Sequence, residues 1–136
     1  MGSSGSSASK FAQSNDGRPS YWHQSGPFDK CQVQSSWGWH VGLHHGVDHI
    51  HSGSKSALRT EKNSKGNVKW FDGGNGKPRP GATYHEVTHY NGNGPTIRQL
   101  KDDSGKNHQG KYHMFNHCHN YADSQLHGWG GKTTKL

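Results

Sequence analysis

The sequence predicts an α+β domain, with a small antiparallel sheet and one helix that carries a cysteine at its N-terminus. Residues 37–44, WGWHVGLH, alternate apolar residues with glycine or histidine, and this period of two is typical of a strand with one buried face. Residues 118–129 instead repeat apolar side chains at helical spacing. Only 26% of the 136 residues are hydrophobic and 20 are glycine, so we expect a small core and long connections.

The length is that of a single domain. Residues 1–20 have the Gly/Ser-rich composition of a flexible lead-in, and the first seven resemble an expression tag. We expect residues 21–131 to form the domain and residues 132–136 to be a tail.

The first predicted element is a hairpin over residues 37–51. A two-residue turn at His45-Gly46 would make the numbers of paired residues sum to 91, which places His40 opposite His51. Directly opposed residues have Cβ atoms roughly 4.5–5.5 Å apart, so the two imidazoles could be coupled. The other face would be apolar and would cover the core with Trp39, Val41, Leu43 and Ile50.

The middle of the chain predicts short strands in long loops. Residues 52–67 are polar and lysine-rich, which favours a loop. Residues 68–71, 83–88 and 96–100 are strand candidates, separated by the turn-forming segments DGGNGKPRPG and NGNGP. Residues 102–111 are a predicted loop.

The last predicted element is an amphipathic helix that Asn116 caps and Gly128 ends. Its apolar face would contain Cys118, Tyr121, Ala122, Gln125, Leu126 and Trp129. Cys118 falls in the first turn, where the positive end of the helix dipole favours a thiolate.

These elements suggest a thiol site. Cys118 would be the nucleophile, His40 the general base, and His51 the group that orients His40. Main-chain N–H groups near the helix start would stabilise an oxyanion. Cys31 and Cys118 are the only cysteines, and we expect both to be reduced because no export signal is recognised.

Two segments resemble the boxes of the H-box/NC family, circularly permuted papain-like proteins of the NlpC type. They are HVGL followed by DHIHSG at 40–53, and NHCHNYADSQL at 116–126. The resemblance implies that His40, His51 and Cys118 form the site. The family includes lecithin:retinol acyltransferase, phospholipid acyltransferases and picornaviral two-A proteins, and the small viral members are the most similar. It implies a thiol acyltransferase or acyl hydrolase of the phospholipase-like kind, or a viral non-structural interaction protein that keeps this fold.

The resemblance has two departures. His117 stands between Asn116 and Cys118, whereas in the family the asparagine usually precedes the cysteine directly, and the segment after residue 129, GGKTTKL, shows no membrane-anchoring helix.

A barnase-like ribonuclease is a second interpretation. Glu86 would act as general base, Arg98 would hold the phosphate and His117 would be the general acid. The basic charge suits RNA, but the second arginine of that site has no counterpart, and Asn116 replaces an aspartate.

Metal and cofactor chemistry are weakly supported. The spacings of the histidines at 44–51 and 113–119 do not follow an ordered zinc pattern, and the glycine-rich segments do not match a phosphate loop. We expect no metal and no cofactor.

A formal net charge of +7 suits RNA, anionic phospholipid or acidic protein partners. No apolar run reaches the length of a transmembrane helix. We therefore expect a cytoplasmic protein, in the host cytoplasm if it is viral, that acts on an acyl or phospholipid substrate or binds a host protein, with RNA as a further partner of its basic surface.

Overall fold

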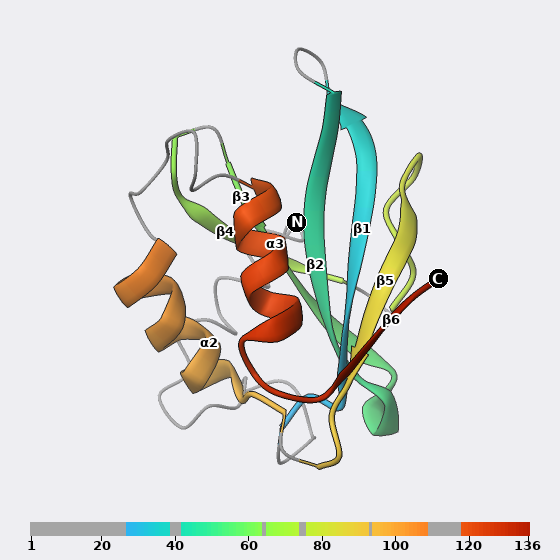
Figure 1. Ribbon diagram of the computed structural model, residues 1–136, viewed down its shortest axis with the longest axis vertical. Helices are drawn as coiled ribbons and strands as arrows, with labels where there is room; N and C mark the ends of the chain where they lie inside the picture. Colours follow the sequence, from blue (N-terminus) through green and yellow to red (C-terminus); the bar gives the residue numbers. More distant parts are fainter. Residues whose placement is uncertain (1–26, 39–41, 64, 74–75, 93, 109–117) are drawn as a thin grey trace, which may run out of the picture.

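The structure is a computed structural model, and it describes residues 27–38, 42–63, 65–73, 76–92, 94–108 and 118–136. It confirms the predicted α+β class: a six-stranded antiparallel sheet has helices packed on one face (Figure 1). The strand order is β4-β3-β2-β1-β5-β6. The strands are β1 Lys30–Gly38, β2 Gly42–His51, β3 Ser56–Lys62, β4 Val68–Asp72, β5 Thr83–His89 and β6 Lys132–Lys135. In the described part of the chain, no helix has the length and apolar character needed to span a membrane.

The predicted turn at His45-Gly46 is wrong. β2 runs through both residues without a break and pairs with β1, from Gly38 opposite Gly42 to Lys30 opposite Ile50. The chain passes from β1 to β2 through residues 39–41, which are outside the described part. Residues 30–36 form the partner strand although they are mostly polar, and such a composition does not indicate a strand with an apolar face. Gly46 then suggested a turn, although it is a strand residue beside large side chains.

Three further predictions in this region have clear outcomes. β4 and β5 confirm the strands predicted at 68–71 and 83–88. The loop predicted at 52–67 is wrong, because the 3-10 turn Ser52–Ser54 leads into β3, whose buried residues include the charged Glu61 and Lys62. The charged residues of this segment favoured a loop in the prediction, although they lie in a buried strand.

The strand predicted at 96–100 is also wrong, because this segment starts the helix α2, Ile97–Asp103. Thr96 accepts a hydrogen bond from the main-chain N–H of Gln99, and the Gln99 side chain accepts one from Thr96, which makes a capping box. The π-helical turn Ser104–His108 continues it into the predicted loop at 102–111.

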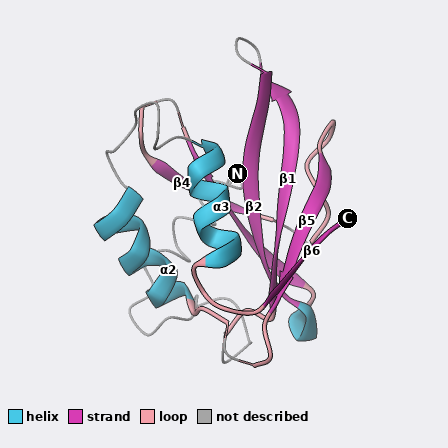
Figure 2. Cartoon of the chain, in the orientation of Figure 1, coloured by secondary structure: helices cyan, strands magenta, loops and turns pink. Residues whose placement is uncertain are grey.

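The helix α3, Cys118–His127, confirms the predicted amphipathic helix and lies against one face of the sheet (Figure 2). Its buried residues are Tyr121, Ala122, Gln125 and Leu126. Tyr121, Ala122 and Leu126 pack on Cys31, Val33 and Val47 of β1 and β2, which face the same side of the sheet. α2 packs beside it through Ile97 and Leu100, in a second cluster with Phe28 and Leu58. The predicted cap Asn116 is outside the described residues.

The other face of the sheet is polar and is covered by the segment before β5. Asp48 is fully buried there and accepts hydrogen bonds from Gln34, Arg59 and Tyr84. Arg59 also donates to the carbonyl of Lys77. The two faces therefore differ in kind, one an apolar core under α3 and the other a polar network.

Candidate thiol site

Cys118 is the first residue of α3 and is half-buried. The β2–β3 register ends at Val47 opposite Thr60, although both strands continue beyond this pair. The main-chain N–H of His45, past the end of this ladder, donates to the Cys118 sulfur. Because the β2–β3 pairing ends at Val47, the N–H of His45 can donate to the thiol. The positive end of the α3 dipole also favours the thiolate form of Cys118.

His44 and Glu61 complete a chain of hydrogen bonds that begins at Cys118. The His44 ring is hydrogen-bonded to the thiol, and its Nε2 contacts Oε1 of Glu61 on β3. Arg79 in turn holds Glu61, with Nη2 3.0 Å from Oε1 and Nη1 3.3 Å from Oε2.

The electrostatics of this group favour a thiolate–imidazolium pair. Hydrogen bonds with Cys118 and Glu61 raise the pKa of His44 to about 9, against the effect of burial. Burial alone would raise the pKa of Cys118, but the hydrogen bonds from His44 and from the N–H groups of His45 and His119 hold it below its ordinary value. Burial would likewise raise the pKa of Glu61, and His44 and Arg79 instead keep it low. Cysteine, histidine and carboxylate therefore have the arrangement of a nucleophile, a base and an orienting group.

Gly46 makes room for the carboxylate. A Cβ atom at this position would lie 3.1 Å from Cγ and 3.4 Å from Cδ of Glu61. Glu61 can therefore lie directly against β2 and reach His44, two residues away on the same face. The glycine that had suggested a turn is needed for the close approach of a side chain.

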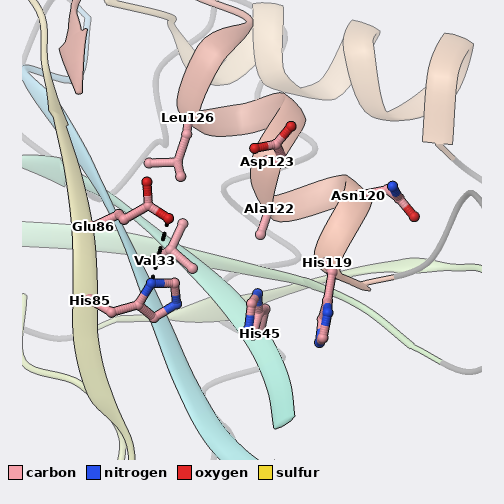
Figure 3. Close-up of a pocket in the computed structure, with 9 residues that line it drawn as sticks. All are labelled: Val33, His45, His85, Glu86, His119, Asn120, Ala122, Asp123 and Leu126. Carbon is pink, nitrogen blue, oxygen red and sulfur yellow. Dashed lines mark ion pairs between the residues drawn. The ribbon is translucent and has the colours of Figure 1, made fainter. Parts of the chain in front are cut away.

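A pocket of about 320 Å³ lies between α3 and the sheet (Figure 3). Its lining includes His45 and His119, the two residues whose main-chain N–H groups reach Cys118. Their rings are stacked with centroids 3.9 Å apart, and the His85 ring lies 5.0 Å from that of His45. The three imidazoles therefore form a row along the pocket.

A β-bulge directs two consecutive residues of β5 to this pocket. The β1–β5 register shifts between Val33, which is opposite Glu86, and Gln34, which is opposite Tyr84. His85 is the extra residue, and a bulge re-aims side chains that would otherwise alternate between the faces. As a result, both His85 and Glu86 line the pocket, 3.7 Å apart as an ion pair (Figure 3).

The residues predicted for the thiol site are only partly brought together. Cys118 begins a helix, as predicted, but His40 is outside the described residues. His51 lies at the far end of β2, opposite Ser56, and is roughly 20 Å along the strand from His44. The histidine that the structure places at the thiol is His44.

The residues of the ribonuclease interpretation lie in different settings. Glu86 is on β5 and lines the pocket, whereas Arg98 is exposed on α2 and not on a strand. His117 is outside the described residues.

Sequence reasoning missed Glu61 and Arg79. Glu61 lies in a segment predicted as loop, and it is buried although it is charged. The one available signal is the alternation Arg59, Glu61 within SALRTEK, which places both side chains on one face once the segment is recognised as a strand.

A second group that could be mistaken for a catalytic triad is Asp103, His108 and Ser124. Nε2 of His108 is 3.0 Å from Oδ2 of Asp103 and 3.4 Å from Oγ of Ser124. A working triad uses one ring nitrogen for the acid and the other for the nucleophile. Here a single nitrogen makes both contacts, so this group links α3 to the π-helical turn and has a structural role.

Among the described residues, no group of three or more His, Cys, Asp or Glu side chains has the geometry to hold a metal ion. The stacked rings of His45 and His119 fit this result, because stacked rings do not converge their nitrogens on one point. Comparison with models of protein families, with curated proteins and with solved structures gives no match to this chain.

Proposed function

We propose that this protein is a cysteine-dependent acyl transferase or acyl hydrolase, with Cys118 as nucleophile, His44 as general acid and base, and Glu61 as the residue that orients His44. The observation that carries the proposal is the hydrogen-bonded chain from Cys118 through His44 to Glu61. A lone cysteine at a helix start would be weak evidence, but a paired imidazole that is itself held by a buried carboxylate is specific to activated thiols.

The proposed reaction has two steps. The Cys118 thiolate forms a bond to the carbonyl carbon of an ester or amide, and the C–O or C–N bond breaks as the proton of the His44 imidazolium passes to the leaving group. Water, or an acceptor alcohol or amine, then attacks the thioester. Its proton returns to His44, and the thiolate leaves. The N–H groups of His45 and His119 are candidates to stabilise the oxyanion.

We also propose a permuted papain-like fold and a relation to the H-box/NC family. In papain-like proteases the cysteine helix precedes the histidine and its partner in the chain. Here β2 with His44 and β3 with Glu61 precede α3 with Cys118, which is the order that a circular permutation gives. The family boxes would then use a histidine four residues after His40, with a carboxylate as the third member.

Alkylation of the thiol as a function of pH tests the site. Iodoacetamide should label one thiol of the native chain rapidly, with a midpoint below the ordinary cysteine value of about 8.5. Cys118→Ala should abolish the labelling, because Cys31 is fully buried and burial raises its pKa to about 11. His44→Ala should raise the midpoint, because it removes the largest influence that lowers the pKa of Cys118, and Glu61→Gln should raise it less.

Matched controls separate this site from the alternatives. His127→Ala changes an exposed histidine on the same helix and should leave the midpoint unchanged. If His40→Ala or His51→Ala raises the midpoint while His44→Ala does not, the site inferred from the sequence is right and the proposed one is wrong. A native midpoint near 8.5 would instead favour a protein that binds RNA or a host protein without thiol chemistry.

A further inference from the structure

The pocket beside Cys118 has a position that suits the acyl group of a substrate. Its lining includes His45 and His119, whose N–H groups contact the sulfur, and it lies between α3 and β5 (Figure 3). A carbonyl carbon at Cys118 would therefore have its substituent directed into this pocket. The following inference rests on the proposed thiol chemistry.

The size and polarity of the pocket argue against a long acyl chain. About 320 Å³ is at the low end of ligand pockets, which cover roughly 300–1,000 Å³. Val33, Ala122 and Leu126 are its apolar lining residues. The remainder of the lining is made of histidines, carboxylates and one amide, so a chain of many methylene groups would not find apolar surface to cover it.

The charge of the lining favours a cation. The chain as a whole has a formal net charge of +7 with neutral histidines, but the pocket is lined by two carboxylates, Glu86 and Asp123, and by no lysine or arginine among its described lining residues. Glu86 is only one-quarter exposed and pairs with His85 at 3.7 Å, whereas Asp123 is at the rim and pairs with His127 at 3.5 Å. Lys135 of β6 is opposite Glu86 in the β5–β6 register but does not line the pocket. Two carboxylates without a lysine or arginine in the described lining favour a positively charged group.

We propose that the pocket binds a short acyl group with a free amino group, an amino acid or the N-terminal residues of a peptide, and that Glu86 accepts hydrogen bonds from the ammonium. Asp123 adds attraction at the rim, and the apolar residues contact a small side chain. The β-bulge that turns Glu86 and His85 towards α3 is the feature that provides this recognition. The bond that Cys118 attacks would be the amide or ester on the carboxyl side of this group.

Binding to a chain that cannot react tests the pocket apart from the chemistry. Cys118→Ala protein would be titrated with L-alanyl-L-alanine amide, N-acetyl-L-alanyl-L-alanine amide and decanoic acid, followed by NMR shifts of the His45, His85 and His119 rings. The free-amino peptide should bind at least about tenfold more tightly than the acetylated one, because a hydrogen bond to a charged group is lost. Equal affinities, or tighter binding of decanoic acid, would overturn the inference.

Two variants with a control identify the carboxylates. Added to Cys118→Ala, Glu86→Gln should remove most of the preference for the free amino group, and Asp123→Asn, on an exposed part of α3, should reduce it less. Asp102→Asn, an exposed acid on α2, should have no effect. If neither pocket variant changes the preference, the proposed recognition is wrong. The alkylation experiment judges the thiol independently, so a failure of the chemistry and a failure of the pocket give different results.

Discussion

Gly46 shows how one absent side chain can decide the geometry of a site. Any Cβ at this position meets Glu61 at 3.1 Å, and Glu61 is the residue that holds His44. Gly46→Ala should therefore displace the carboxylate by a few tenths of an ångström and raise the pH midpoint of Cys118 alkylation. Strand backbone accepts alanine, so the free energy of unfolding should change little.

Gly105→Ala is the control for that substitution. A Cβ at Gly105 has open space around it, and this residue is in the π-helical turn away from the thiol. Its alkylation profile should match the native one. An unchanged profile for Gly46→Ala would show that Glu61 does not need its present position to activate the thiol.

His49 is a second residue with a measurable electrostatic effect. Burial lowers the pKa of this fully buried imidazole to about 3, and its Nε2 is 3.0 Å from Oγ1 of Thr60. Because the folded pKa is below the ordinary value of 6.5, His49 contributes stability that is fully present above about pH 6.5 and is lost as the pH falls towards 3.

Urea unfolding between pH 7 and pH 4 measures this contribution. Over this range the free energy of unfolding of the native chain should fall by on the order of several kcal/mol more than that of a His49→Gln chain, because the glutamine cannot be protonated. His89→Gln, at an exposed position of β5, should keep the native pH dependence. If the free energy of unfolding depends on pH in the same way in the native chain and in His49→Gln, His49 is not buried in its neutral form.

At the scale of elements, the prediction from sequence succeeded where one face is apolar and failed where buried residues are polar. α3 was recognised because Tyr121, Ala122 and Leu126 repeat at helical spacing. β3 was missed because Glu61 and Lys62 are buried although they are charged, and burial of charge depends on partners that come from elsewhere in the chain.

The same reason limits prediction of the site. Cys118 could be identified, since its position in a first turn is local information. His44 could not be distinguished from His40 by the sequence pattern, because residues four apart in a strand face the same side. Glu61 and Arg79 join the site only through the fold of the sheet.

At the scale of the whole molecule, the polar network around Asp48 joins four strands and the segment before β5. Arg59 binds both oxygens of this carboxylate, with Nε 2.7 Å from Oδ1 and Nη2 3.0 Å from Oδ2. Arg59→Met should destabilise the fold by about 3–5 kcal/mol, because it leaves a fully buried charge without its cation. The free energy of unfolding in urea measures this loss.

A double variant separates a lost ion pair from lost packing. Arg59→Met with Asp48→Leu removes both charges and should recover a large part of the lost stability. Apolar residues of similar size can often replace a buried ion pair without a loss of stability. If the double variant is as unstable as Arg59→Met plus Asp48→Leu measured singly, the charges are not coupled as the structure indicates.

The separation of β2 and β3 beyond Val47 and Thr60 also has a consequence for folding. The thiol meets an imidazole from β2 and, through it, a carboxylate from β3, so three segments distant in sequence must all be in place before the pKa of Cys118 falls below its ordinary value. In an unfolded or partly folded chain Cys118 is an ordinary thiol. The rate at which Cys118 is alkylated during refolding should therefore rise when the sheet and α3 come together. Alkylation at successive refolding times measures when this step of folding occurs.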